Sequence, residues 1–259
     1  MRLDPAVLAA GVRLIERVAV GSTNTEAMVL ARKGERGPLW ITAGRQSAGR
    51  ARRGRVWVSE SGNLYASLLL TDPSPPERAA ELSFVASLAV HDAVATLAAP
   101  IAKQLALKWP NDVLIAEKKF SGILIEGEDA AVVVGIGINC VSHPKNATFP
   151  ATDLAAMGIS VQFASLFERL SAAMMRRLAL WNRGDGFDAI RADWLARAAG
   201  VGEPIRVVLN EGERSGRFET VDTRGRLVLR LNDGTNETIT AGDVFAPATD
   251  RHSFAVGER

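Results

Sequence analysis

The segment Gly44–Arg55, GRQSAGRARRGR, contains five arginines, three glycines and no acidic residue. Glycine and alanine give the backbone freedom and bury little apolar surface, so packing alone does not order this segment. Guanidinium groups bind carboxylate and phosphate oxygens through paired hydrogen bonds. We therefore expect a loop that is mobile when empty and becomes ordered around an anionic ligand; the alternative is a solvated surface loop.

Two further motifs follow apolar, strand-like runs. Lys108 precedes Trp109-Pro110-Asn111-Asp112, which places a lysine at the end of a strand before a proline-fixed turn. Such a lysine would offer a compact positive charge to a carboxylate or phosphate, although a tight turn alone would explain the same residues. In Gly135-Ile136-Gly137-Ile138-Asn139, the glycines would let a ligand approach the backbone, and Asn139 could pair with a ring edge. A structural bulge is the alternative there.

Together the three motifs suggest a site for a nucleotide and a second acid. No nucleophile stands out, so catalysis would consist of positioning and charge neutralisation, which suits attack of a carboxylate on an α-phosphate. The sequence has no Walker phosphate loop, no H-E-x-x-H motif and no G-x-S-x-G elbow. His91, His143 and His252 are far apart in the sequence, so we expect no protein metal site.

Composition narrows the class of protein. The 259 residues are 47% hydrophobic and 23% charged, which is typical of a soluble protein with one core and a smaller unit. A net charge of +2 excludes a protein-wide basic surface. A single cysteine, Cys140, excludes an internal disulfide. We find no signal peptide and no stretch near the roughly 18 apolar residues of a spanning helix, so we expect a cytoplasmic protein without a membrane partner.

Hydrophobic periodicity and turn residues predict the elements that position these motifs. A weak helical pattern lies within residues 1–20, and a second helix is expected from the cap at Ser22 to about Arg32. The other expected helices are 77–98, 161–181 and 187–199. The expected strands are 39–42, 56–59, 64–70, 105–109, 113–116, 122–126 and 132–138.

After Gly200 the sequence becomes rich in short β-like runs. These runs are separated by turn residues such as Asn232-Asp233-Gly234, which has a hairpin signature. We therefore expect a domain boundary near residue 200, with a larger domain at 1–200 and a small barrel at 201–259. The expected strands of the smaller domain are 205–209, 216–222, 227–231 and 237–240.

In this order, the motifs resemble those of biotin protein ligases from about residue 20 to the C-terminus. The combination of K-W-P-N-D with a following S-G-I-L-x-E is the most specific part of the resemblance. It implies an α+β fold, with a mixed sheet and helices of the class II aminoacyl-tRNA synthetase and biotin ligase type, followed by an SH3-like β-barrel. The segments that carry it are 22–24, 46–55, 63–65, 108–112, 119–124 and 135–139.

The resemblance implies a two-step reaction. Biotin and ATP, with Mg²⁺ on the ATP phosphates, would give biotinyl-5′-AMP, and the biotin would then pass to a lysine of a biotin carboxyl carrier protein or domain. About 20 residues precede Ser22, too few for the helix-turn-helix domain of some relatives, so we expect a monofunctional ligase with no DNA partner. Relatives often form side-by-side dimers, and the sequence does not decide between a monomer and a homodimer.

Matching motif to motif, the resemblance also implies site residues. Lys108 and Arg50 would be catalytic and stabilise charge as the adenylate forms, while Asp112 would shape the pocket without a direct metal contact. Ala51 stands where many relatives have glycine. The residues expected to bind biotin are Ser22, Thr23, Asn24, Gln46, Gly49, Arg50, Ala51, Arg52, Lys108 and Gly122. Those expected to bind the nucleotide are Arg50, Arg52, Arg53, Trp57, Asn111 and Asn139.

Three other functions are weighed against this one. A lipoate ligase or octanoyltransferase shares the fold and would activate or transfer a different acid. A nucleic-acid-binding module would use the basic loop on phosphates and lose affinity steeply with salt. An interaction protein without chemistry is the third. The last two leave the lysine and glycine motifs unexplained.

Overall fold

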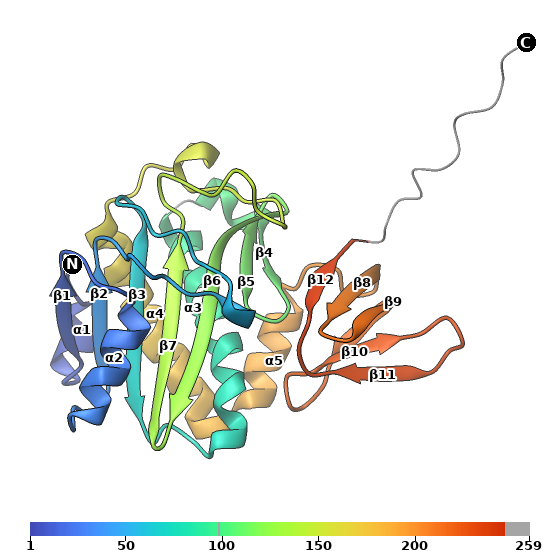
Figure 1. Cartoon of the computed structure of the whole chain (residues 1–259), viewed down its shortest axis with the longest axis horizontal. Helices are drawn as coiled ribbons and strands as arrows, with labels where there is room; N and C mark the ends of the chain where they lie inside the picture. Colours follow the sequence, from blue (N-terminus) through green and yellow to red (C-terminus); the bar gives the residue numbers. More distant parts are fainter. Residues whose placement is uncertain (98, 247–259) are drawn as a thin grey trace, which may run out of the picture.

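Two β-sheets of different size organise the chain, and Figure 1 shows them side by side. The computed structural model describes residues 1–97 and 99–246. The larger sheet has seven strands in the order β1-β2-β3-β7-β6-β5-β4. Only β1 and β2 pair in parallel, and every other neighbouring pair is antiparallel. The strands are β1 (Arg13–Arg17), β2 (Leu39–Ala43), β3 (Leu64–Thr71), β4 (Leu105–Lys108), β5 (Asp112–Ile115), β6 (Lys118–Glu128) and β7 (Ala131–Ile138).

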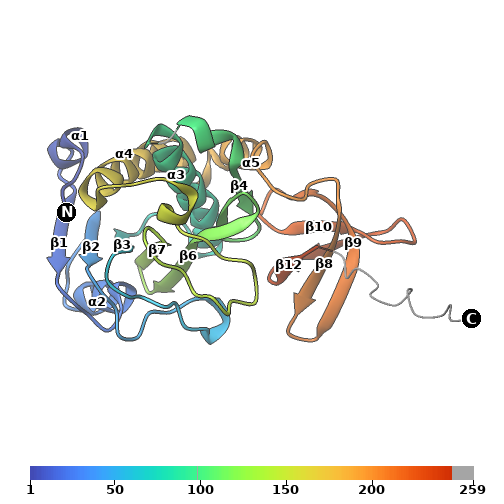
Figure 2. The ribbon, with the colours of Figure 1, turned by 90° about the horizontal axis from the view of Figure 1, so that it is seen from above.

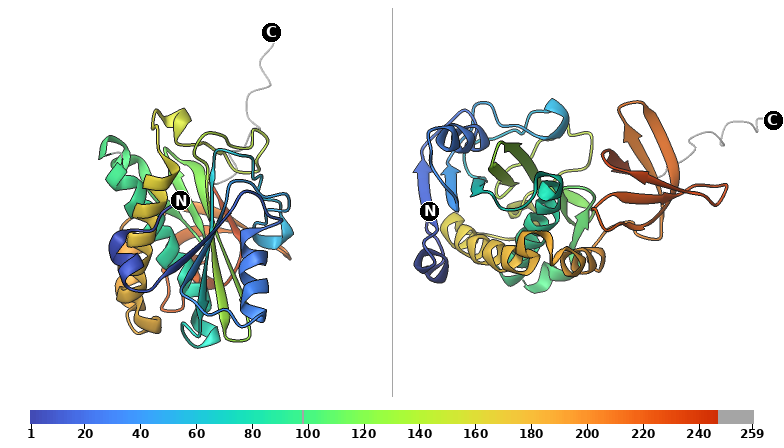
Figure 3. Two further views of the ribbon diagram at one scale, coloured as in Figure 1. Left: turned by 90° about the vertical axis from the view of Figure 1, so that its left-hand side faces the viewer. Right: turned by 90° about the horizontal axis from the view of Figure 1, so that it is seen from below.

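Helices cover both faces of this sheet, which explains why β2, β3 and β7 are nearly continuous apolar runs. Figures 2 and 3 show α2 alone on one face and α1, α3, α4 and α5 on the other. A small cluster that includes Ala27, Ile41 and Val133 lies under α2, and the main core fills the opposite side. The helices are α1 (Pro5–Ala9), α2 (Thr23–Arg32), α3 (Leu82–Leu97), α4 (Phe163–Trp181) and α5 (Phe187–Leu195).

Short 3₁₀ turns connect several of these elements. Two of them matter for the site: η1 (Arg52–Gly54) lies within the basic loop, and η4 (Ala155–Met157) follows the loop after β7. The others are η2 (Pro76–Glu81), η3 (Ala99–Gln104) and η5 (Asn182–Gly184).

The expectation that no segment would be long and apolar enough to cross a membrane was wrong for Pro76–Leu97, which has a mean hydropathy of 1.3 in its most apolar window. This segment comprises η2 and α3. Most of α3 is buried, between the large sheet and helices α4 and α5. A helix that is apolar on all sides is typical of the centre of a protein core.

The smaller sheet has five antiparallel strands in the order β11-β10-β9-β8-β12. Among the hydrogen bonds that attach it to the larger unit, Trp109 Nε1 donates to the Gly225 carbonyl at 3.0 Å, and Arg191 Nη1 donates to the Val221 carbonyl at 2.9 Å. The expected α+β class, with a mixed sheet, helices and a small β unit, is confirmed. The strands are β8 (Pro204–Leu209), β9 (Gly212–Val221), β10 (Leu227–Arg230), β11 (Asn236–Ile239) and β12 (Asp243–Phe245).

Several local predictions need correction. Residues 13–17 form edge strand β1 rather than continuing a helix, because Leu14 and Ile15 pair with β2. Residues 56–59 form no strand, and only Val56 makes an isolated bridge, to Arg50. Strand β12 was not predicted, since three residues carry little periodic signal. The capped start of α2 is confirmed, because the Ser22 side chain accepts from the Thr25 backbone N–H. The end of the predicted helix at residue 98 lies outside the described residues.

Candidate active site

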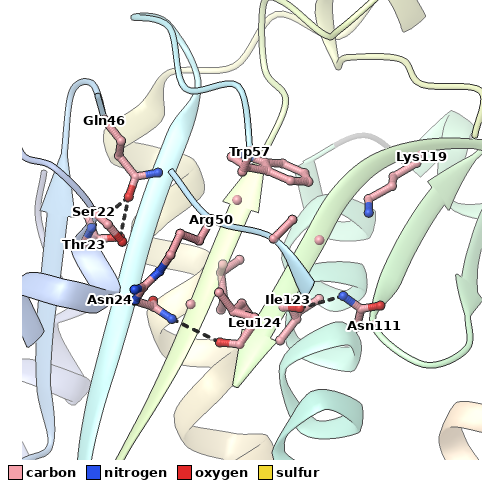
Figure 4. Close-up of a pocket in the computed structure, with 15 residues that line it drawn as sticks. Ser22, Thr23, Asn24, Gln46, Arg50, Trp57, Asn111, Lys119, Ile123 and Leu124 are labelled. Atoms are coloured by element: carbon pink, nitrogen blue, oxygen red, sulfur yellow. Dashed lines mark hydrogen bonds between the residues drawn. The ribbon is translucent and has the colours of Figure 1, made fainter. Parts of the chain in front are cut away.

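A small cavity lies between the start of α2, the glycine-containing parts of β6 and β7, and the basic loop (Figure 4). Its free volume is about 40 Å³, enough for only a few water molecules. Helix α2 and strands β6 and β7 form most of the cavity wall, and the basic loop covers the cavity. Its lining residues are Ser22, Thr23, Asn24, Gln46, Arg50, Ala51, Trp57, Asn111, Lys119, Gly122, Ile123, Leu124, Gly135, Ile136 and Gly137.

A hydrogen-bond network fixes the end of this cavity nearest α2. Gln46 Oε1 accepts from the Thr23 backbone N–H at 2.8 Å and from Thr23 Oγ1 at 3.0 Å. Gln46 Nε2 donates to Ser59 Oγ at 2.9 Å. The buried hydroxyl of Ser67 contacts Thr23 Oγ1 and Asn24 Oδ1. Because these polar groups already hold one another, a ligand would meet donors and acceptors that are set in place before it arrives.

Arg50 of the basic loop reaches over the cavity to a carboxylate of the large sheet beside Asn24. Its Nη2 donates to Glu126 Oε2 at 2.9 Å, and the same oxygen accepts from Asn24 Nδ2 at 2.8 Å. The Arg50 side chain is 46% exposed, so water or another anion can replace Glu126 as its partner. We infer that Glu126 holds Arg50 over the cavity until an acidic ligand replaces it.

Glycines on β6 and β7 make room for two side chains in the cavity wall. An added Cβ at Gly135 would lie 2.2 Å from Asn24 Oδ1, and one at Gly137 would lie 2.6 Å from the Trp57 ring. Gly122 pairs with Gly137 across the strands, and a Cβ there would lie 2.9 Å from the same ring. The Trp57 ring therefore rests on a glycine-lined patch that no other residue type would leave open.

A second, larger cavity of about 360 Å³ adjoins the first. It is bounded by the basic loop, the turn between β4 and β5, the loop after β7 and strand β12 of the small sheet. Most of its walls are loops rather than strands. Its lining residues are Ala51, Arg52, Arg55, Val56, Trp57, Val58, Lys108, Asn111, Asp112, Lys119, Asn139, Pro144, Asn146, Ala147, Thr148, Phe149, Ala151, Asp243 and Phe245.

The two cavities share Ala51, Trp57, Asn111 and Lys119. Lys119 Nζ lies 2.5 Å from Asp112 Oδ1 and 5.3 Å from the centroid of the Trp57 ring. Its ammonium group is therefore at the boundary between the two cavities. A charge at this point could stabilise a reaction between groups held on either side.

Lys108 lines only the second cavity. Its Nζ lies 3.7 Å from Asp112 Oδ2 and 4.1 Å from the centroid of the Phe149 ring. Burial lowers the pKa of Lys108, and the charge of Lys119 lowers it further, while Asp112 opposes both. An anion in this cavity would favour the charged form and raise that pKa again.

The arginines at the end of the basic loop point toward the small sheet. Arg52 Nη1 donates to Asn111 Oδ1 at 3.1 Å, and burial lowers the pKa of this guanidinium. Arg53 and Arg55 both pair with Asp243, at 3.0 and 2.9 Å. Carboxylates of the chain itself thus neutralise part of the loop's positive charge, and Arg53 lies outside both cavities. Whether the loop becomes mobile stays a prediction.

The structure brings most of the expected residues to one of the two cavities, though not always the expected one. Gly49 lines neither; a Cβ there would lie 2.4 Å from Ser59 Oγ, so it permits two segments of the loop to cross. Asn139 lines the second cavity and donates to the Thr152 carbonyl. Around the first cavity lie Ser22, Thr23, Asn24, Gln46, Arg50 and Gly122; around the second, Arg52, Lys108 and Asn139; around both, Ala51, Trp57 and Asn111.

Sequence reasoning assigned no role to several residues that the structure places at the site, among them Lys119, Glu126, Phe149 and Asp243. Lys119 and Glu126 belong to motifs that were recognised, and their charges within those motifs were a usable signal. Phe149 and Asp243 carried no such signal, because Phe149 lies in an irregular loop, Asp243 begins a strand of only three residues, and both reach the site only through the fold.

Carboxylates do not gather into a metal site in the part of the chain that the structure describes. No group of three or more His, Cys, Asp or Glu side chains there could hold an ion. In the second cavity, Asp112 faces the ammonium groups of Lys108 and Lys119, and Asp243 is paired with two arginines. These residues do not fit a resident metal, because their charge is already neutralised.

Comparisons with known proteins support one assignment. Residues 19–141 match the biotin/lipoate A/B protein ligase family, and residues 200–246 match the biotin protein ligase C terminal domain. The chain is 41% identical over 235 residues to a biotin--[acetyl-CoA-carboxylase] ligase of Paracoccus denitrificans, which covers 86% of this chain and 96% of that relative. It is 33% identical to the ligase of the same description from Mycobacterium tuberculosis, over 90% of this chain and 89% of the relative.

Solved structures agree with the sequence relatives. The fold is similar to that of the biotin protein ligase from Aquifex aeolicus in complex with biotin and ATP, with a TM-score of 0.78 and 27% sequence identity. The similarity covers 90% of this chain and 97% of that chain. Both units of the fold therefore have a counterpart in one known architecture.

Proposed function

Because the chain belongs to the biotin protein ligases of the biotin/lipoate A/B protein ligase family, we propose that its two joined cavities are a biotin site and an ATP site. The enzyme converts biotin and ATP to biotinyl-5′-AMP and pyrophosphate, and then transfers biotin to a lysine of a carboxylase carrier domain. The observation that carries the assignment of the cavities is their shared boundary at Lys119.

In the first step, a carboxylate oxygen of biotin attacks the α-phosphorus of ATP, and the bond to the β-phosphate breaks to release pyrophosphate. Both reactants are anions, so their approach needs cations at the meeting point. We place Lys119 and Arg50 there, with Arg52 and Lys108 on the nucleotide side. Lys108 thus remains a charge-stabilising group in the proposal, and Lys119 becomes the one nearest the forming bond.

In the second step, the amine of the carrier lysine attacks the acyl carbon of the adenylate. AMP leaves with the bonding electrons, and the amine gives up its proton. The loop over the first cavity separates the adenylate from water until the carrier arrives, which limits hydrolysis of this mixed anhydride. The free volume of about 40 Å³ is too small for biotin, so the proposal requires Arg50 and Trp57 to move aside when biotin enters.

The remaining assignments follow from the same geometry. We assign the biotin ring to the polar network of Thr23 and Gln46, and the adenine to the cavity that contains Trp57 and Asn139. Mg²⁺ would enter as MgATP, because the carboxylates present do not form a site for it. We propose a two-domain division near residue 200, an acetyl-CoA carboxylase carrier as the acceptor and a cytoplasmic location where ATP is available. A role at DNA is not part of the proposal, and sedimentation would show whether protomers form a homodimer.

The decisive experiment measures which acid supports exchange of labelled pyrophosphate into ATP, and which acid becomes attached to a purified carrier domain. Biotin should support both reactions, whereas lipoate and octanoate should support neither. Exchange that depends on lipoate or octanoate would assign the chain to the other branch of the family. Strong nucleic-acid binding that falls steeply with salt would favour the nucleic-acid-binding module instead.

A further inference from the structure

We propose that His143 and Asp153 form a clasp that positions the wall of the nucleotide cavity, and that both are positioning residues for ATP. This inference rests on the assignment of the second cavity to ATP. His143 Nδ1 lies 2.5 Å from Asp153 Oδ2. Asp153 is buried and His143 is partly exposed. The pair joins the two ends of the loop that leaves β7 and returns beside β6.

The segment between the two residues forms one side of the second cavity. Pro144, Asn146, Ala147, Thr148, Phe149 and Ala151 all line it. The ring of Phe149 lies over the Lys108 ammonium at 4.1 Å. A change in the base of this loop would therefore move the wall of the nucleotide site and the group that packs against Lys108, while the polar network around Thr23 lies on the far side of Trp57.

Other contacts fix the two flanks of the loop but not its centre. Before His143, Asn63 Oδ1 accepts from the backbone N–H groups of residues 140–142. After the centre, the Lys119 backbone N–H donates to the Pro150 carbonyl, and the Lys119 carbonyl accepts from the Thr152 N–H. No hydrogen bond joins residues 144–149 to another segment of the described chain. The contact between His143 and Asp153 is therefore the hydrogen bond that joins the two ends of this segment.

The two carboxylate oxygens of Asp153 have separate tasks. Oδ2 meets His143, and Oδ1 accepts from the Ala156 backbone N–H at 2.7 Å, which caps η4. Asp153→Asn keeps an oxygen for the cap and removes the carboxylate charge, so the charge-assisted hydrogen bond with the imidazole is lost. The substitution can therefore break the clasp while leaving the turn that follows it intact.

The test compares KM for ATP with KM for biotin in pyrophosphate exchange. His143→Ala and Asp153→Asn should each raise KM for ATP about tenfold, because loss of one charge-assisted hydrogen bond is worth about that factor. The KM for biotin should stay within twofold. His143→Asn, whose amide N–H can replace Nδ1–H, should recover most of the loss. Lys145→Ala is the matched control, since Lys145 is exposed on the same loop and does not line the cavity.

Three outcomes would overturn the clasp: an unchanged KM for ATP in both variants, an equal rise in KM for biotin, or failure of His143→Asn to recover ATP affinity. Thermal unfolding of each variant separates a positioning effect from general destabilisation, and His143→Asn gives a folded comparison if His143→Ala unfolds. Failure of the proposed function itself would look different, because the unmodified enzyme would then show no biotin-dependent exchange at all.

Discussion

The two cavities lie next to each other but are built in different ways. The first cavity, the proposed biotin cavity, is enclosed by α2, β6, β7 and the basic loop, and its polar groups hydrogen-bond to one another. The ATP cavity is enclosed mainly by loops and by one strand of the small sheet. Regular elements therefore form most of the wall of the first cavity, whereas the second depends mainly on loops that are held by charge.

The basic loop shows the same contrast within 12 residues. At one end, Arg50 pairs with Glu126 of the large sheet, beside the biotin cavity. At the other end, Arg53 and Arg55 pair with Asp243 of the small sheet. The loop thus contacts both units, and the proposed closure over the adenylate would depend on how the small sheet is placed. Substitutions at its two ends should have different consequences.

The largest effect is expected at the boundary that the two cavities share. Lys119→Ala should slow adenylate formation by roughly 10²–10³-fold, the usual scale for removal of one preorganised charge-stabilising group. Lys108→Ala should act mainly through a higher KM for ATP, because its ammonium lines only the second cavity. Lys118→Ala serves as the control, since Lys118 is an exposed neighbour on the same strand. Equal losses in the rate of adenylate formation for the two variants would contradict the separate roles proposed for Lys108 and Lys119.

The next effect is expected at the end of the loop over the biotin cavity. Arg50→Ala should release biotinyl-AMP faster, by about tenfold or more, because charge-assisted hydrogen bonds are worth about 1.5–3 kcal/mol each. Retention of the intermediate can be followed by rapid gel filtration with labelled biotin. Arg45→Ala, an exposed residue of the same loop that lines neither cavity, should release it at the unmodified rate.

A smaller effect, about tenfold, is expected from filling the wall of the biotin cavity. Gly135→Ala places a Cβ 2.2 Å from Asn24 Oδ1, which must displace Asn24 and loosen its hydrogen bonds to Ser67 and Glu126. KM for biotin should rise while KM for ATP changes little. In Gly127→Ala the nearest atom to the new Cβ is 3.7 Å away, so this variant should behave like the unmodified enzyme. If both alanines are tolerated, the biotin cavity is less rigid than its hydrogen bonds indicate.

The smallest effect concerns the pH dependence of the contact with the small sheet. Burial raises the pKa of Asp243, but hydrogen bonds and charge from Arg55 and Arg53 outweigh it, so the pKa lies below its usual value. A lowered carboxyl pKa contributes stability that is fully present above the unfolded pKa of about 3.9 and is lost as pH falls through the folded pKa. For a partly exposed pair this amounts to about 1 kcal/mol or less.

Denaturant titrations of the unmodified enzyme and of Asp243→Asn provide the measurement. The difference in unfolding free energy between them should be constant from about pH 8 to pH 5 and should shrink only below about pH 4. A difference that disappears near neutral pH would show that Asp243 is not held as a carboxylate by the loop arginines.

The contrast between the cavities also explains what could be predicted from the sequence. Elements around the proposed biotin cavity could be predicted because their sequence signals are local. Ser22 caps a helix, and Gly135 and Gly137 interrupt an apolar strand. The small β unit could be predicted because its sequence, rich in turn residues and short β-like runs, differs from the sequence before residue 200. Each of these inferences needs only neighbouring residues.

The other contacts of the site could be identified only from the three-dimensional structure. Arg53 was assigned to the nucleotide, but its partner Asp243 lies 190 residues away and nothing in the local sequence links them. Lys108 and Lys119 are both lysines near a strand end, and only the packing of β5 against β6 shows which one reaches the shared boundary. Strand β1 was missed because an exposed edge strand lacks a strong apolar pattern.

The hydrogen bond from the Trp109 indole to Gly225 has a consequence for how such enzymes can be inherited and recombined. Trp109 is 1% exposed and directly follows Lys108 in the chain. Exchange of the small sheet for an unrelated module would leave this indole N–H without an acceptor and would free the backbone that carries the lysine. The two units are therefore constrained to change together, and a graft at their junction must supply a carbonyl where Gly225 stands.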